Sequence, residues 1–171
     1  MAEISATKVK ELRELSGAGI MDCKRALENT GGDIAKAAEI LKEQGLARAE
    51  KKAERTAKQG IIEAYIHAGG RIGAMAEVNC ETDFVARTDD FKRLVHDIAM
   101  QVAATNPTVV GNESKPEGST DGQDVANENV LLKQPFIKDP SIAIGDLVKN
   151  AIAKTGENIV IKRFARFELG I

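Results

Sequence analysis

Residues 60–80, GIIEAYIHAGGRIGAMAEVNC, decide the fold of this chain. Two apolar runs with a period of two flank Gly69-Gly70, a pair that tolerates positive φ and suits a two-residue turn. The stretch therefore predicts a β-hairpin. One face of its second strand is entirely apolar and consists of Ile72, Ala74, Ala76 and Val78. Because such a face must be buried, we expect helices to cover it.

The sequence after the hairpin predicts the rest of an α+β core over residues 60–171. A helix is indicated by apolar residues at helical spacing, namely Phe91, Leu94, Val95, Ile98, Ala99 and Val102, and Pro107 should end it. The polar stretch 112–129 predicts a flexible loop near 108–130. A second core helix follows and should end at Gly156, and residues 158–169 form the last strand. Together these elements predict a small antiparallel three-stranded sheet covered by helices.

Residues 1–45 read as three short helices. Ser5 can cap the first helix, Gly17 should end it, and Val9, Leu12 and Leu15 form its apolar stripe. The second covers about 21–29, and the third begins after Asp33 and should stop at Gly45. Helices this short are not stable alone, so they must pack as a bundle with one face free for a partner.

The segment 46–59 predicts a charged connecting helix, with alanines every four residues and basic side chains on the other faces. A basic stripe for nucleic acid is the less favoured alternative. The chain as a whole has 171 residues and a formal net charge of −2, which argues against a dedicated nucleic-acid binder. Cys23 and Cys80 form no CxxC unit, and no apolar run approaches the roughly 20 residues that cross a bilayer. A soluble intracellular protein without membrane association is the expectation.

No motif in the sequence indicates catalysis. There is no Walker A loop, no GxGxxG after a strand and no metal-spaced His/Cys set. We therefore expect no cofactor, no bound metal, no direct nucleotide binding and no enzymatic activity. His67 and His96 are most simply ordinary surface or packing residues.

The junction NCETDFVAR, residues 79–87, joins the second hairpin strand to the next helix. An apolar ring beside a carboxylate, Phe84 beside Asp83, suits a probe that enters a cleft in another protein. The alternative is that the ring folds back onto the core. On the residues alone, core packing of Phe84 is slightly favoured.

Three motifs resemble the elongation factor Ts family, and they occur in that family's order. They are LRELSGAGIMDCKRALENTGGDIAKAAEIL (12–41), EVNCETDFVAR (77–87), and QPFI (134–137) with GENIVIKRFARFELG (156–170). The resemblance implies that residues 1–45 form a ubiquitin-associated-type bundle. It also implies a guanine-nucleotide exchange factor that acts on elongation factor Tu in translation elongation, in the cytoplasm or a plastid stroma.

The resemblance further implies which residues bind elongation factor Tu. Arg13, Ile20 and Met21 match the positions that grip its GTPase domain, although the family often has Met where Ile20 stands. Thr82, Asp83, Phe84 and Val85 belong to the core signature, in which the Asp-Phe pair pushes beside the magnesium site. Phe136 and Ile137 match a stretch that approaches the third domain of elongation factor Tu.

The chain departs from the family in one region. Short members usually carry further helical sequence before the QPF stretch, where this chain has the polar loop. The single short core resembles forms in which two copies pair through their sheets, so a homodimer is implied. Two other functions remain open on the residues alone: a helix-binding adaptor built on the bundle, and a ribosome- or RNA-associated protein.

Overall fold

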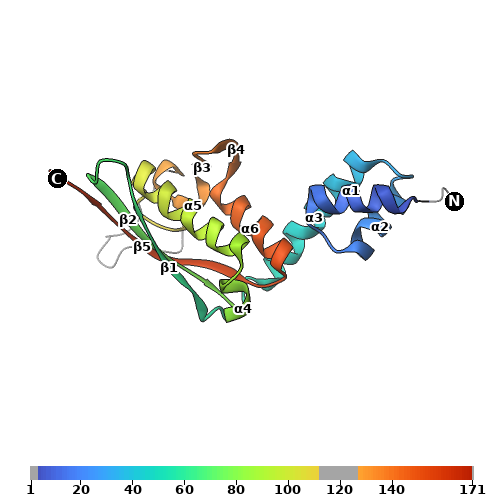
Figure 1. The fold of residues 1–171 in the computed structure, drawn as a ribbon, viewed down its shortest axis with the longest axis horizontal. Coiled ribbons are helices and arrows are strands. Elements are labelled where there is room, and N and C mark those ends of the chain that lie inside the picture. The colour runs from blue at the N-terminus through green and yellow to red at the C-terminus, as the bar shows by residue number, and fades with distance from the viewer. Residues whose placement is uncertain (1–3, 112–126, 171) are drawn as a thin grey trace.

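The computed structural model describes residues 4–111 and 127–170. A bundle of α1 (Ala6–Ser16), α2 (Ile20–Asn29) and the first part of α3 (Ile34–Lys52) stands at one end of the molecule (Figure 1). The sheet and its covering helices stand at the other end, and α3 leads from one to the other. The α+β class, with an N-terminal helical bundle and a small sheet, is confirmed. The division of the chain into separately folding domains stays a prediction.

The bundle is built from capped helices around a small core of its own. The Ser5 hydroxyl oxygen accepts a hydrogen bond from the Lys8 backbone N–H at 3.3 Å, and Gly17 ends α1 with φ of 66°. The buried cluster consists of Leu12, Cys23, Ala26, Leu27, Ala37 and Leu41. Leu15, expected on the same stripe, is exposed. It lies in the last turn of α1, although Ser16 and Ala18 after it are half-buried.

Gly45 does not end the third helix, and the prediction that it would was wrong. Helix α3 continues through Gly45 to Lys52, so the bundle helix and the connecting helix are one element. The connecting helix also stops earlier than residue 59, where the first strand begins. A Cβ built on Gly45 would lie 3.0 Å from the Cβ of Ala153, which belongs to the later helix α6 (Ile144–Thr155). Close packing against α6 thus offsets the weak helix propensity of glycine.

The three-stranded sheet has the order β1-β2-β5, with both pairs antiparallel. It comprises β1 (Gln59–Ile66), β2 (Ile72–Cys80) and β5 (Ile159–Glu168). The predicted hairpin is confirmed, but its connection is longer than two residues. The His67 N–H donates to the Ile72 carbonyl at 2.8 Å and the Gly70 N–H to the His67 carbonyl at 2.9 Å. Gly69 and Gly70 both adopt positive φ, as expected for two adjacent glycines in a turn.

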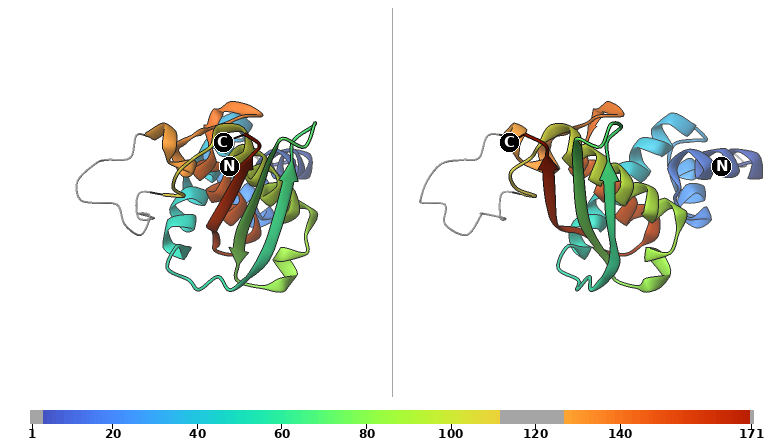
Figure 2. Two further views of the ribbon diagram at one scale, coloured as in Figure 1. Left: turned by 90° about the vertical axis from the view of Figure 1, so that its left-hand side faces the viewer. Right: turned by 60° about the vertical axis from the view of Figure 1, so that its left-hand side comes forward.

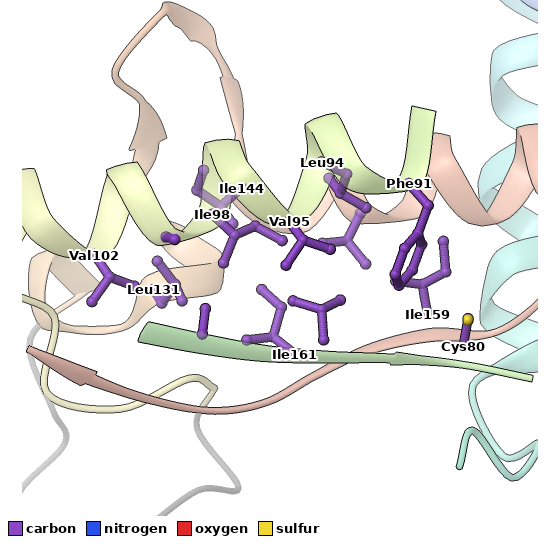
Figure 3. Packing of buried hydrophobic residues seen from close by; sticks show 14 of the residues in the cluster. Cys80, Phe91, Leu94, Val95, Ile98, Val102, Leu131, Ile144, Ile159 and Ile161 are labelled. Atoms are coloured by element: carbon purple, nitrogen blue, oxygen red, sulfur yellow. The ribbon is translucent and has the colours of Figure 1, made fainter. Parts of the chain in front are cut away.

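Helices α5 (Asp89–Thr105) and α6 (Ile144–Thr155) lie on one side of the sheet (Figure 2). Their apolar side chains point toward the strands and meet inward-facing residues of β2 and β5 (Figure 3). Phe91, Val95 and Ile98 of α5 are almost fully buried. The covered face of β2 is the predicted one, because Ala74, Ala76 and Val78 are buried. Helix α5 ends at Asn106, in the left-handed region, just before Pro107.

A second, two-stranded sheet was not predicted. It pairs β3 (Pro135–Phe136) with β4 (Asp139–Ala143) and follows two 3-10 turns, η1 (Asn127–Asn129) and η2 (Leu131–Lys133). The buried Gln101 of α5 secures it, since its Oε1 accepts from the Ile137 N–H at 2.9 Å and its Nε2 donates to Gln134 Oε1 at 3.2 Å. Strands this short carry little periodic signal, so their pairing depends on such long-range bonds.

The predicted flexible loop near 108–130 is tied down at both described ends. The Thr108 N–H donates to the Asn129 carbonyl at 2.9 Å, and Val109 bridges Val130. The remainder of that prediction, 112–126, lies outside the described residues. Within the described ranges, none of the helices is long and apolar enough to span a bilayer.

Candidate partner-binding surface

Phe84 projects from the molecule at the end of the sheet. It lies in the four-residue helix α4 (Asp83–Ala86), which follows β2 directly, and its side chain is 79% exposed. Core packing of this ring, slightly favoured by the residues alone, was therefore wrong. A large apolar ring held in water contributes little to folding but offers much area to a partner.

The backbone that carries Phe84 is anchored on both sides. Before it, the Thr82 hydroxyl oxygen accepts from the Val85 N–H at 3.4 Å and caps α4. After it, Val85 and Ala86 are buried in the core cluster. The ring consequently extends from a rigid strand–helix junction rather than from a loose loop.

Asp83 is also exposed, and its carboxylate pairs with the Arg87 guanidinium at 2.8 Å one helical turn later. Both side chains lie largely in water, so this pair adds little stability. The carboxylate therefore remains available to a partner beside the Phe84 ring, which is the arrangement that the sequence suggested for a probe.

Two of the residues implied to bind the partner are buried in the core. Val85 and Phe136 are each only 6% exposed and belong to the buried cluster around α5. Both side chains support the fold in the isolated chain, and their assignment as contacts with a partner stays a prediction. Ile137, next to Phe136, is partly exposed and keeps a surface position. Phe136 belongs to β3 and faces the core, whereas Ile137 lies in the turn that follows the strand.

Three exposed apolar side chains flank the turn between α1 and α2 on the bundle. We call them the bundle patch: Leu15, Ile20 and Met21, with exposed Arg13 beside them in sequence. More than half of each apolar side chain is exposed. Sequence reasoning found Ile20 and Met21 through the family motif but placed Leu15 inside.

Two ion pairs of Asp22 lie next to this patch in sequence and leave its apolar side chains exposed. Asp22, next to Met21, accepts from the Arg48 guanidinium at 2.9 Å and from Arg25 at 2.5 Å. The hydrogen bond and charge of Arg48, with the charge of Arg25, hold the pKa of the Asp22 carboxyl below its ordinary value. Since Arg48 belongs to α3, the pair fixes α2 against the long helix.

The buried thiol of Cys80 lies beside the Phe84 junction. It donates to the Thr82 carbonyl at 3.1 Å, and burial, followed by the nearby Glu157 charge, raises the pKa of the thiol above its ordinary value. A thiol held neutral in this way is a packing residue rather than a nucleophile. Among the residues that the structure describes, no three His, Cys, Asp or Glu side chains gather as metal ligands would.

Known proteins resemble this chain over nearly its whole length. The sequence model of the family described as elongation factor TS matches residues 1–123. Elongation factor Ts from Carboxydothermus hydrogenoformans is 52% identical, over 98% of this chain and 89% of the relative. Those from Coprothermobacter proteolyticus and Herpetosiphon aurantiacus are 51% and 50% identical, over 98% of this chain and 99% and 98% of the relatives.

These alignments span 194 or 195 positions, whereas the chain has 171 residues, so each relative carries residues without a counterpart here. The extent of the match and the identity along it leave no ambiguity about the family. The chain belongs to the elongation factor Ts family.

Proposed function

We propose that the chain, a translation elongation factor by its family, is a guanine-nucleotide exchange factor for elongation factor Tu. The observation that carries this proposal is Phe84, an aromatic ring 79% exposed on a junction anchored by the core. Such a ring can enter a partner's cleft without first leaving the core of its own protein. The chain itself catalyses no covalent step and binds no nucleotide.

The proposed mechanism follows from how GTPases hold GDP. A phosphate-cradling loop and Mg²⁺ bind the nucleotide, and the ion neutralises much of the phosphate charge. Inserting Phe84 and Asp83 beside that ion displaces the elements that position it, so bound factor weakens bound GDP. The coupling is reciprocal, and GTP rebinding in turn expels the factor. A coupling of about 5–6 kcal/mol corresponds to about 10⁴-fold in nucleotide affinity.

The bundle patch supplies docking in this proposal. Leu15, Ile20 and Met21, all exposed beside the α1–α2 turn, are proposed to act together as an apolar surface, with exposed Arg13 near them in sequence. An apolar surface of this kind fits the apolar face of a helix on the partner. The bundle then contributes affinity for elongation factor Tu, and Phe84 contributes release of GDP. Ile137, at the tip of the β3–β4 hairpin, is proposed to approach the third domain of the partner.

The test is GDP release from elongation factor Tu, measured with a fluorescent GDP at increasing concentrations of the factor. Phe84→Ala should lower the maximal release rate by about tenfold or more, because a central aromatic anchor contributes about 2 kcal/mol. Leu169→Ala, which truncates another exposed apolar side chain, should leave the rate unchanged. Normal release by Phe84→Ala, or tight binding of labelled GDP to the isolated factor, would contradict the proposal.

A specific observation also favours pairing of two copies through the sheet. The face of the sheet opposite α5 and α6 carries exposed apolar side chains, and we call four of them, Ile62, Ile66, Met75 and Phe167, the sheet patch. In the described part of the chain no helix covers this face (Figure 2). A homodimer would bury it against its own copy, in an isologous interface.

The alternative functions predict different behaviour. A helix-binding adaptor would use the bundle patch but would not need Phe84, and an RNA-associated protein would bind with a steep dependence on salt. A complex with nucleotide-free elongation factor Tu that is lost on adding GDP, and that changes little between low and moderate salt, supports exchange. We expect these events in the cytoplasm.

A further inference from the structure

The turn between α6 and β5 reaches back to the junction that carries Phe84. Glu157 Oε2 accepts from the Thr82 backbone N–H at 3.0 Å, and Glu157 Oε1 accepts from the Thr82 hydroxyl at 2.6 Å. The bonding is reciprocal, because Glu81 Oε1 accepts from the Asn158 backbone N–H at 2.7 Å. Two neighbouring residues of the junction are thereby bonded to two neighbouring residues of a turn that is distant in sequence.

The same turn holds the end of α3. Lys52 Nζ donates to the Gly156 carbonyl at 2.6 Å, and the buried Asn158 amide donates to the carbonyls of Ala53 at 3.2 Å and Arg55 at 2.7 Å. The α6–β5 turn is therefore fixed from two sides. It cannot shift relative to α3 without breaking these bonds, so the junction is bonded to a stationary support.

Glu157 also strengthens the cap on α4. When the Thr82 hydroxyl donates its proton to the carboxylate, its lone pairs remain free to accept from the Val85 N–H. Hydrogen bonds linked in this way polarise one another. Helix α4 has only four residues and is too short to hold its shape by its own backbone bonds. Its direction, and with it that of the Phe84 ring, depends on the cap.

We propose that Glu157 is a positioning residue for nucleotide exchange: it fixes Thr82, and through Thr82 it aims Phe84 at the partner. This inference rests on the proposed exchange function. Glu157 does not touch the partner in this scheme, so it influences the rate of GDP release rather than the strength of docking. Removing its carboxylate leaves Phe84 present and exposed but free to point elsewhere.

The experiment measures the rate of GDP release separately from the strength of docking. GDP release from elongation factor Tu is followed by stopped flow over a range of factor concentrations, with Glu157→Ala, Glu157→Gln and the exposed control Glu43→Ala. Glu157→Ala should lower the maximal rate about tenfold, equivalent to about 1.4 kcal/mol, since it removes charge-assisted bonds. The concentration for half-maximal rate should change less than about twofold, because the bundle patch still docks.

Glu157→Gln is the conservative variant. Its carbonyl oxygen can accept from the Thr82 N–H while its amide group faces the Thr82 hydroxyl oxygen, so the geometry survives without the charge. It should recover the maximal rate to within about threefold of the unchanged protein. If the Glu157 carboxylate only stabilised the fold in general, this pattern would not appear. The pattern is a maximal rate that falls in Glu157→Ala and recovers in Glu157→Gln, while the half-saturating concentration stays constant.

A double-mutant cycle then tests the route through Phe84. If Glu157 acts by aiming the ring, Glu157→Ala should add no further loss to Phe84→Ala. Losses that multiply, or a normal maximal rate in Glu157→Ala, would overturn the inference. Normal release by Phe84→Ala alone would instead overturn the proposed function, so the two failures are distinguishable.

Thr82→Val keeps the test decisive if Glu157→Ala does not fold, as judged by circular dichroism and thermal unfolding. This change removes the hydroxyl that bonds Glu157 Oε1 and retains the backbone N–H that bonds Oε2. It should lower the maximal rate and add nothing to Phe84→Ala. An unchanged maximal rate in Thr82→Val, or a loss that multiplies with Phe84→Ala, would equally overturn the role of Glu157.

Discussion

Gly45 in the middle of α3 faces Ala153 on α6 so closely that a Cβ on Gly45 would lie 3.0 Å from the Ala153 Cβ. The helix that leaves the bundle is therefore set against the core by the absence of one side chain. This contact is one part of the packing of α3 on α6, which holds the bundle against the core.

Gly45→Ala should destabilise the protein despite the better helix propensity of alanine. The gain in propensity is about 1 kcal/mol, whereas overpacking costs about 1–3 kcal/mol. We expect a net loss of about 1 kcal/mol in the free energy of unfolding, measured with urea. Combining it with Ala153→Gly should restore the space and recover the packing part of the loss. An unchanged or raised stability in Gly45→Ala alone would show that α3 and α6 can separate at no cost.

Phe84→Ala and Phe91→Ala should differ sharply in stability. Phe91 is 1% exposed in the core, so its truncation should cost about 3–5 kcal/mol in the free energy of unfolding. Phe84 is exposed, and its truncation should change that free energy by less than about 0.5 kcal/mol. Thermal and urea unfolding of the two variants provide the comparison. A large loss of stability in Phe84→Ala would indicate that the Phe84 ring stabilises the fold.

Met21→Ala should weaken docking and leave the maximal exchange rate intact. Truncating an apolar residue of the bundle patch removes contact area that is buried only in the complex, so the half-saturating concentration should rise about three- to tenfold. The measurement is the concentration dependence of GDP release, with Glu39→Ala on the exposed side of α3 as control. A lower maximal rate at unchanged half-saturation would assign Met21 to the exchange step.

Asp22 should make stability depend on pH. Its folded-state pKa is lowered by Arg48 and Arg25, so the carboxylate stabilises the fold above its unfolded pKa of about 4, and this contribution disappears as the pH falls through the folded value. The pair is partly exposed, so we expect Asp22→Asn to cost about 1 kcal/mol or less at pH 7 and nothing near pH 2. Urea unfolding from pH 2 to 7 measures the difference. Arg48→Gln should show a similar loss at pH 7, and a constant difference across the range would contradict the ion-pair explanation.

The sheet patch should control self-association. Ile66→Lys places a charge in the apolar face that two copies would bury, so it should shift the protein from dimer to monomer in sedimentation velocity experiments. Ile20→Lys introduces the same charge on the bundle patch and should leave the association unchanged. A monomer in the unchanged protein at high micromolar concentration would contradict pairing through the sheet.

The sequence alone determined the features that depend on local periodicity and on caps. The hairpin around Gly69-Gly70, the helix that contains Phe91 and the three N-terminal helices follow from the spacing of apolar residues and from helix-ending or turn-forming residues. Both the period of a strand and that of a helix are properties of neighbouring residues, so no distant contact was needed to read them. The family motifs added the expectation that Phe84 serves a partner.

Only the tertiary structure decided which apolar residues are covered and where a helix can continue. Gly45 remains helical where α6 packs against it, and Leu15 is exposed although it shares a stripe with the buried Leu12. Phe136 is buried because the bonds of Gln101 hold the β3–β4 hairpin on α5. Glu157 bonds to Thr82 although the two residues stand 75 positions apart in the sequence. Burial and long-range hydrogen bonds depend on residues far apart in the chain, whereas periodicity depends on neighbours, and for this physical reason the exposed ring and its support were settled by the fold.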